Sequence, residues 1–189
     1  MAEALRREPL PLTCVTPGAV VVRQGEVVGR PLVVVAGALR ESCLSREGRE
    51  LVLGVLGPGD LVTPSPCAAA RSTIRAIRVS RLREAVSHEM VRLLATREER
   101  SLELACDLAW LDVTDRLERR LEDLAARFGR PGPGGELIDV FLTQGDLAGL
   151  VGASRERVNR ALGTLARRGR IRLAGRGRYV LRPPLRALA

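Results

Sequence analysis

The chain has 189 residues, 46% of them hydrophobic, which is enough to build a packed core in one large or two small domains. No apolar run approaches the roughly 18 to 20 residues that a membrane span needs, so we expect a soluble, cytoplasmic protein that does not bind membranes. Cys14, Cys43, Cys67 and Cys106 are too scattered for a zinc site or a disulfide scaffold, and His88 is the single histidine. The composition therefore predicts neither a metal nor a cofactor, and no enzyme.

Positive charge is concentrated near the carboxyl end. All 31 basic residues are arginine, and residues 143–189 hold 11 of them against only Asp146 and Glu156. This segment accounts for the whole net charge of +9, and the rest of the chain is neutral overall. Such a regional excess is typical of a phosphate-binding surface, because neutralising phosphates releases condensed counterions. We therefore expect this segment to bind nucleic acid.

Short apolar runs separated by glycines extend from Leu12 to about Arg78. Turn-forming glycines between short apolar runs predict an antiparallel roll or barrel of short strands. The expected strands cover residues 19–22, 32–35, 38–44, 51–56, 60–62 and 73–79.

Residues 80–128 contain neither glycine nor proline and are rich in Leu, Arg, Glu and Ala, which predicts helix throughout. Alternating four and three spacings indicate a coiled-coil seam that joins two chains, in which the two polar members would specify the dimer. Packing of the same stripe on the strand domain is the alternative. The seam residues are Met90, Leu94, Arg97, Ser101, Leu104, Leu108 and Leu111.

A hinge near Trp110 would separate this helix from a second one. The second helix, capped by Asp112 or Thr114, would end at Phe128.

Residues 129–135 are rich in glycine and proline, and we expect them to be a loop. A short strand is expected within residues 136–142, and a helix-turn-helix follows it. Thr143 and Asp146 have the spacing of a capping box, with Asp in place of Glu. Gly152 permits a tight turn and Ser154 can cap a second helix. The buried face of that helix would consist of Val158, Ala161, Leu162 and Leu165. Two short helices joined in this way predict DNA binding.

The second helix begins with side chains suited to reading bases. Arginine can donate two hydrogen bonds to guanine, and glutamate can accept one from cytosine. We therefore assign base reading to Arg155, Glu156 and Arg160, which lie within its first turn and a half. Residues 170–181 resemble a hairpin with alternate basic residues, a wing that would grip backbone phosphates. Secondary or phosphate contacts are expected from Thr143, Ser154, Arg157, Asn159, Arg176 and Arg178.

Nearly the whole chain resembles the cyclic-AMP receptor protein (CRP/FNR) family. Residues 143–171 resemble its winged helix-turn-helix, with Gly152-Ala153-Ser154-Arg155-Glu156 on the motif, and residues 108–114 resemble its hinge. The resemblance implies an α+β fold: an antiparallel β-roll in residues 1–86, a dimerisation helix and hinge in 87–112, and a winged helix-turn-helix in 113–189. It further implies a homodimeric activator that binds double-stranded DNA at inverted TGTGA-like half-sites and contacts RNA polymerase through residues 129–135.

The effector pocket departs from that family's cyclic-nucleotide members. They carry a Gly-Glu pair after the Gly-Asp turn, which residues 61–70 lack, and the prolines there remove backbone donors. The candidate effector residues that remain are Arg71, Ser72 and Ser101, so we predict DNA binding without cyclic AMP. A ligand-independent regulator, an unknown small effector and a thiol switch stay open. A non-specific architectural DNA-binding protein is the alternative from another class, and a cupin-type enzyme would need more histidines.

Overall fold

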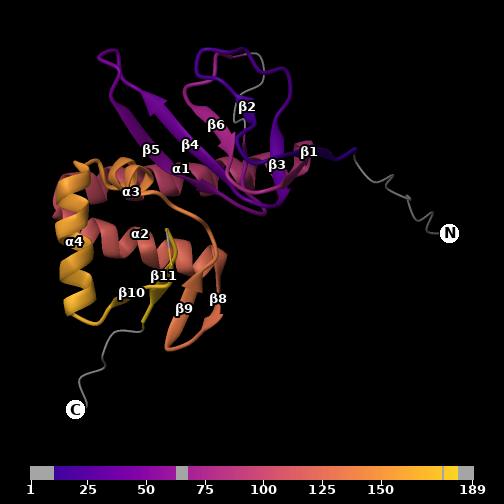
Figure 1. The fold of residues 1–189 in the computed structure, drawn as a ribbon. Helices are drawn as coiled ribbons and strands as arrows, with labels where there is room; N and C mark the ends of the chain where they lie inside the picture. The colour runs from indigo at the N-terminus through magenta and orange to yellow at the C-terminus, as the bar shows by residue number, and fades with distance from the viewer. Residues whose placement is uncertain (1–10, 63–67, 176, 183–189) are drawn as a thin grey trace.

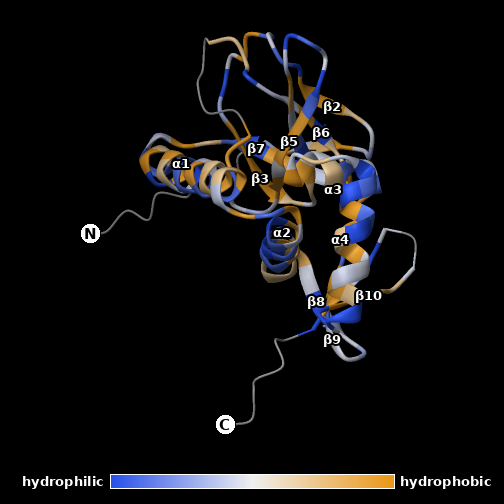
Figure 2. Cartoon of the chain, turned by 90° about the vertical axis from the view of Figure 1, so that its left-hand side faces the viewer, coloured by the Kyte–Doolittle hydropathy of each residue, from blue (hydrophilic) through white to orange (hydrophobic). Residues whose placement is uncertain are grey.

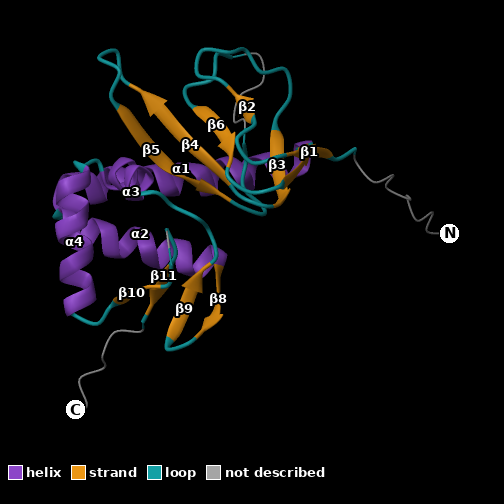
Figure 3. Cartoon of the chain, in the orientation of Figure 1, coloured by secondary structure: helices purple, strands orange, loops and turns teal. Residues whose placement is uncertain are grey.

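The amino-terminal half forms a roll of two antiparallel sheets (Figures 1 and 3). The computed structural model describes residues 11–62, 68–175 and 177–182. The strands are β1 (Thr13–Val15), β2 (Val20–Val22), β3 (Leu32–Ala36), β4 (Leu39–Leu44), β5 (Glu50–Leu56), β6 (Thr73–Ala76) and β7 (Ser80–Glu84). One sheet has the order β1-β7-β3 and the other β2-β6-β4-β5. Val34, Leu39, Ile74 and Leu82 lie in the core of the roll. The predicted antiparallel roll is therefore confirmed.

Two local expectations about the roll are wrong. Residues 60–62 form no strand but a single bridge between Leu61 and Val33. Residues 80–84 are not helical, because β7 pairs with both β1 and β3. Ser80 and Leu82 are buried while Arg81 between them is exposed. This period of two is that of a strand, and the lack of glycine and proline permits a helix without requiring one.

Two long helices follow, α1 (Ser87–Trp110) and α2 (Val113–Phe128). The carboxylate of Asp112 accepts the backbone N–H groups of Thr114 and Asp115 at 2.7 and 3.0 Å, so Asp112 caps α2. Near the end of α1, the buried Asp107 accepts hydrogen bonds at 2.6 and 2.5 Å from Arg119 and Arg120 of α2. The hinge between the two helices is therefore clamped by ion pairs.

The carboxy-terminal part combines a helix pair with a four-stranded sheet. Its elements are β8 (Gly129–Gly132), β9 (Gly135–Ile138), α3 (Gln144–Val151), α4 (Arg155–Arg167), β10 (Ile171–Leu173) and β11 (Tyr179–Leu181). The sheet order is β10-β11-β9-β8, which confirms the wing hairpin. The loop expected at residues 129–135 is instead the β8–β9 hairpin, and β9 ends four residues before Leu142. Pro131 is tolerated there because β8 is an edge strand, where a missing N–H group is harmless.

The two halves share one apolar core instead of being separated by the hinge. Ala38 and Val52 of the roll belong to the same buried cluster as Leu117 of α2 and Leu147 of α3. Gly149 of α3 faces Val52, and a Cβ atom at Gly149 would lie 2.3 Å from a Val52 methyl carbon. Only glycine therefore allows this approach of α3 to β5 without rearrangement.

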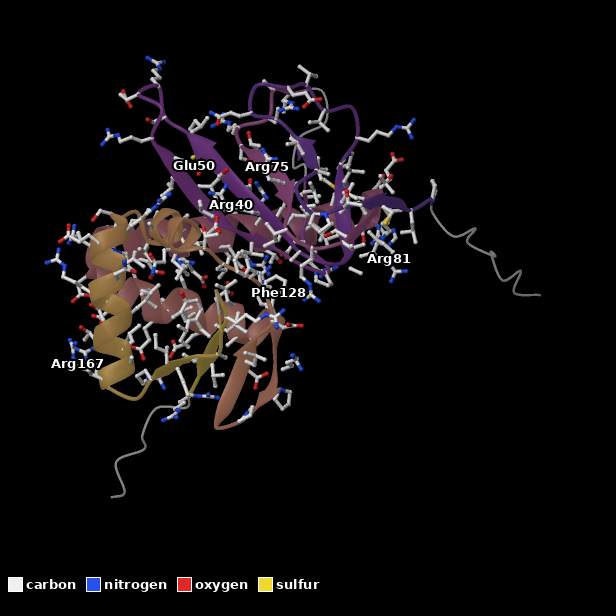
Figure 4. All side chains as sticks on the ribbon, in the orientation of Figure 1. Arg40, Glu50, Arg75, Arg81, Phe128 and Arg167 are labelled. Atoms are coloured by element: carbon white, nitrogen blue, oxygen red, sulfur yellow. The ribbon has the colours of Figure 1, made fainter. Side chains whose placement is uncertain are left out.

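An ion pair supplements this contact at its edge. Nε of Arg40 lies 2.7 Å from Oδ1 of Asp146 in α3, although not aligned for a hydrogen bond. The same guanidinium donates two hydrogen bonds of 2.8 Å to Glu50, its neighbour in Figure 4. These bonds lower the pKa of Glu50 from 4.5 to about 2. Arg40 thus joins both strands of the β4–β5 hairpin to the first helix of the helix-turn-helix.

A second paired carboxylate joins β7 to α1. Arg83 donates hydrogen bonds of 2.6 and 2.8 Å to the two carboxylate oxygens of Glu89, which also accepts the N–H group of Val86 at 2.9 Å. The bonds from Arg83 are the main cause that lowers the pKa of Glu89 from 4.5 to about 2.

We expect this pair to contribute an acid-sensitive part of the stability. Because the folded pKa lies below the unfolded one, ionised Glu89 favours the folded chain above about pH 5, and this contribution is lost as the pH falls through about 2. Urea denaturation across this range should show a smaller loss of unfolding free energy in Glu89→Gln than in the natural chain. Glu99→Gln, at an exposed position on the same helix, serves as the control. Identical pH slopes for Glu89→Gln and the natural chain would contradict the assignment.

Candidate nucleic-acid interface

The helix-turn-helix is built by local caps that the sequence predicts. The hydroxyl of Thr143 accepts the N–H group of Asp146 at 3.0 Å, and the Asp146 carboxylate accepts the N–H group of Thr143 at 2.9 Å. Gly152 ends α3 in the left-handed conformation, with φ of 59°. Ser154 then accepts the N–H group of Arg157 at 3.3 Å and caps α4. The capping box, the turn glycine and the second cap are therefore confirmed.

One face of α4 is buried and the opposite face is free. Val158, Ala161 and Leu165 are buried in the shared core, and Leu162 packs against that core. The residues assigned to DNA contact at the start of α4 are all exposed. In Figure 2 the end of α4 next to α3 is blue, which marks hydrophilic residues. In Figure 4 the side chains of the outer face, Arg167 among them, point away from the molecule. The exposed residues are Arg155, Glu156, Arg157, Asn159 and Arg160.

The base-reading candidates Glu156 and Arg160 are held only weakly by contacts within the chain. Arg160 and Glu156 form an ion pair of 3.5 Å, with side chains that are 71% and 81% exposed. A pair this exposed contributes at most about 1 kcal/mol, so either side chain can exchange it for a base edge. The start of α4 also carries the positive end of the helix dipole, which favours phosphate groups. Structurally, this end of α4 is free to contact DNA.

Some arginines of the wing are exposed to solvent, and others are bound to groups of the chain itself. Arg178 is exposed and stands beside Gly177, whose carbonyl accepts the N–H group of Leu142 at 3.0 Å. Arg170 is largely buried and is held by Glu118 and Glu122 of α2, the latter at 2.7 Å. Arg172 donates to the carbonyl of Pro133 at 3.0 Å. The expectation that all alternate basic residues of the wing face phosphates is therefore wrong for Arg170, which anchors the wing.

The candidate effector residues of the roll are not assembled into a cradle. Ser72 is buried and donates a 2.5 Å hydrogen bond to the buried carboxylate of Glu41, which also pairs with Arg97 of α1. Arg71 is exposed, and Ser101 donates to the backbone carbonyl of Arg97 at 2.9 Å. Of the three predicted residues, Ser72 has its hydroxyl bound to a carboxylate of the chain itself.

Glu41 and Arg97 form a largely buried ion pair that the sequence analysis missed. Glu41 has the same parity in β4 as the buried Leu39, and both side chains point into the roll. A buried carboxylate requires a partner, so an inward-facing glutamate is the signal that would have suggested an arginine on the packed helix. Pro64, Pro66, Cys67 and Arg176, which the sequence analysis used, lie outside the described residues.

Several of the predicted seam positions on α1 face their own chain. Leu104 is buried, Met90 packs against the buried Leu93, and Arg97 is paired with Glu41. Leu108 and Leu111 are half-buried, whereas Leu94 and Ser101 are exposed. Arg97 therefore has a partner within its own protomer, which accounts for a polar residue at this position.

An exposed stripe on another face of α1 keeps the alternating spacing of the predicted seam, displaced by one residue and so turned by about 100° around the helix. Val91 is 80% and Leu102 64% exposed, with Leu94 beside them. Glu98 is the polar member of the stripe. The stripe consists of Val91, Ala95, Glu98, Leu102, Ala105 and Ala109, all exposed. A mainly apolar stripe with four-three spacing on a free helix face has the pattern of a helix-pair seam.

Comparison with known proteins agrees with this architecture. A Crp-like helix-turn-helix domain model matches residues 115–188, and a cyclic nucleotide-binding domain model matches residues 12–97. The chain is 35% identical over 176 residues to the CRP-like cAMP-activated global transcriptional regulator of Mycobacterium tuberculosis, which covers 84% of this chain and 79% of that protein. In the part of the chain that the structure describes, no helix is both long and apolar enough to cross a membrane, and no cluster of His, Cys, Asp and Glu is suited to a metal.

Solved structures show the same fold. The c-di-GMP responsive global regulator CLP of Xanthomonas campestris matches with a TM-score of 0.74 at 26% identity, over 92% of this chain and 94% of that one. A CRP/FNR family transcriptional regulator of Thermus thermophilus matches with a TM-score of 0.79 at 23% identity, over 92% and 94% of the two chains. With a roll, a long helix and a capped helix-turn-helix in the same order, this chain belongs to the CRP/FNR family of transcription regulators.

Proposed function

We propose that the chain is a sequence-specific regulator that acts as a homodimer and inserts the start of α4 into the major groove of DNA. The observation that supports this most directly is the free face of α4, which presents Arg155, Glu156 and Arg160 together at its amino-terminal end. Recognition helices contact base edges with this end. The residues that bury α4 lie on the opposite face, so docking on DNA requires no unfolding.

The donor and acceptor pattern favours G·C-containing half-sites. Two arginines can each read a guanine, while Glu156 can accept from a cytosine amino group. With the family resemblance, this supports an inverted repeat of TGTGA-like half-sites, centred about one helical turn apart. Exposed Arg178, with Arg157 and Asn159, would supply backbone contacts. Activation through RNA polymerase, with the β8–β9 hairpin as a contact, is part of the same proposal, as is a cytoplasmic location.

A homodimer supplies the two-fold reader that an inverted repeat requires. The exposed stripe on α1 is the surface that supports it, since Val91 and Leu102 are otherwise large apolar side chains in water. Its alanines would permit close approach of two helices. The dimer seam we propose is therefore this stripe, with Leu94 and Ser101 at its edge as the members retained from the seam predicted by sequence.

We further propose that DNA binding does not depend on cyclic AMP, although the mycobacterial relative is named as cAMP-activated. Ser72 is bonded to Glu41, and the Glu41 carboxylate pairs with Arg97. A phosphate entering here would meet a buried negative charge and would have to break both contacts, which is costly in a low-dielectric site. A regulator gated by a cyclic nucleotide or another small effector is the second candidate, favoured by the match to the cyclic nucleotide-binding domain model.

Base reading can be tested by selecting bound sequences from a random pool. Arg155→Ala and Arg160→Ala should each cost about 1–3 kcal/mol and relax the preference at one position per half-site. Arg178→Ala is the matched control, because loss of a phosphate contact should weaken all sequences alike and lower the salt slope by about one. An unchanged preference in Arg155→Ala, together with an altered one in Arg178→Ala, would refute the assignment. Uniform coverage of genomic fragments in footprinting would point instead to an architectural protein.

The dimer seam can be tested by analytical ultracentrifugation. We expect the natural chain to sediment as a dimer at micromolar concentration and Val91→Glu/Leu102→Glu to sediment as a monomer, because like charges would face each other across the axis. Val79→Glu places a charge on an apolar residue that is 60% exposed in the roll, away from α1. This control should remain dimeric. A monomeric natural chain would reject the proposed homodimer, and a dimeric double variant would reject this seam.

Independence from cyclic AMP can be tested by calorimetry and DNA anisotropy on the same samples. The natural chain should bind its site with equal affinity in the presence and absence of physiological cyclic AMP. Glu41→Gln removes the buried charge while keeping a hydrogen-bonding group for Ser72, and is the variant most favourable to nucleotide entry. Saturable binding of cyclic AMP by the natural chain, with a matching gain in DNA affinity, would establish the effector-gated candidate instead.

A further inference from the structure

A cavity of about 560 Å³ lies between the roll, α1 and α2. Leu53 and Leu56 of β5, Leu104 of α1 and Leu124 of α2 contribute apolar lining, and α3 closes it with Leu150. Ligand sites are commonly apolar cavities of about 300–1,000 Å³ between domains, with a few polar groups that fix orientation. The size and position of this cavity therefore match those of a small-molecule site.

The polar lining of the cavity is dominated by arginine. Three buried carboxylates, those of Glu41, Asp60 and Asp107, are 5%, 6% and 2% exposed. The guanidinium groups that bind them are more accessible, and Arg100 and Arg119 are 40% and 62% exposed. The five lining arginines are Arg97, Arg100, Arg119, Arg120 and Arg127. A molecule in the cavity therefore reaches these guanidinium groups more readily than the three buried carboxylates.

The remaining acidic residues lie at the exposed rim. Glu122 is bonded to Arg170 at 2.7 Å and Asp123 to Arg127 at 3.3 Å, while Glu103 also lines the rim. They offset the excess of two positive charges over the buried carboxylates, so an anion would be bound by direct contact with individual guanidinium groups and not by a net positive charge of the lining.

This cavity adjoins the surfaces already assigned and shares Ser101 and Ala105 of α1 with them. The α1 residues that line it, such as Arg100, Leu104 and Asp107, lie on the face opposite Val91 and Leu102 of the proposed seam, as the helical repeat of 3.6 residues requires. Of the candidate effector residues, Ser101 lines the cavity, whereas Arg71 and Ser72 do not, and the cavity also contains the Glu41–Arg97 pair.

We propose that this interdomain cavity binds a small organic anion, a carboxylate or phosphate group on an apolar body. The anionic group would bind Arg100 of α1 and Arg119 of α2, the two lining arginines with the more exposed side chains, and the apolar body would rest on the leucines. Since β5, α1 and α2 all supply lining, the bound anion stabilises the docked arrangement of the helix-turn-helix on the roll. This regulatory consequence rests on the proposed DNA-binding function, whereas the binding site itself does not.

The site can be probed in the full-length protein with anilinonaphthalene sulfonate, a fluorescent dye whose sulfonate stands in for the carboxylate or phosphate. We expect saturable binding of one dye per protomer. Arg100→Gln/Arg119→Gln should weaken it by about tenfold, the factor that corresponds to about 1.4 kcal/mol. Thr96→Trp, at a lining position, should block it by filling the cavity. Arg81→Gln, on the far side of the roll in Figure 4, is the control and should leave it unchanged.

Several outcomes would overturn the site. The first is that the dye does not bind saturably. The second is that the natural chain, Arg100→Gln/Arg119→Gln and Thr96→Trp bind the dye equally, because the dye would then bind elsewhere. Competition with benzoate and with pyrophosphate then distinguishes the two anion sources. Displacement by benzoate supports a carboxylate on an apolar body, displacement by pyrophosphate supports a phosphate, and displacement by neither rejects an anion site.

Coupling to DNA is measured separately, because linkage requires that DNA and the anion change each other's affinity by the same factor. Dye affinity that shifts when a bound DNA site is added supports the regulatory consequence. Unchanged dye affinity on DNA rejects that consequence while leaving the cavity as a binding site. Failure to bind any DNA, with dye binding intact, would reject the proposed function alone.

Discussion

Two buried carboxylates hold the three parts of this chain in one arrangement. Asp60, in the turn after β5, accepts the N–H group of Gly57 at 2.8 Å and pairs with Arg100 of α1 and Arg127 of α2. Asp107 of α1 is held in the same way by two arginines of α2. A buried carboxylate without partners costs several kcal/mol, so these charges are tolerated only when roll, long helix and helix-turn-helix are assembled. The orientation of α4 depends on that assembly.

Arginine, which supplies all the basic residues of this protein, has two distinct roles. Arg40, Arg83 and Arg170 are partly buried and paired; Arg40 and Arg170 connect elements that are distant in sequence, and Arg83 joins β7 to α1. Arg155 and Arg178 are exposed at the surfaces proposed to meet DNA. The planar guanidinium suits both tasks, because it pairs with carboxylates inside the protein and with guanines or phosphates outside it. Composition alone cannot separate the two groups, since burial decides which arginines remain available.

The roll has the fold of the family and contains a paired, inward-facing carboxylate, that of Glu41. Its two antiparallel sheets form the β-roll that the family resemblance implied, but Glu41 occupies an inward position of β4 and is paired with Arg97. Neither residue was assigned this role from sequence, because the pairing spans 56 positions of the chain. The open space lies instead towards α2, where the carboxylates are covered by guanidinium groups. A molecule bound in that space would meet guanidinium groups paired with buried carboxylates.

Local signals were sufficient for the helix-turn-helix. Thr143, Gly152 and Ser154 each act on backbone groups within three or four residues, so caps and turn could be predicted without knowledge of the fold. Tertiary contacts decided the pairing of β7, the β8–β9 hairpin and the face of α1 that remains free. These depend on which distant segment competes for a side chain, as Glu41 does for Arg97. A sequence pattern records the period of a helix face, but only packing shows which face is already occupied.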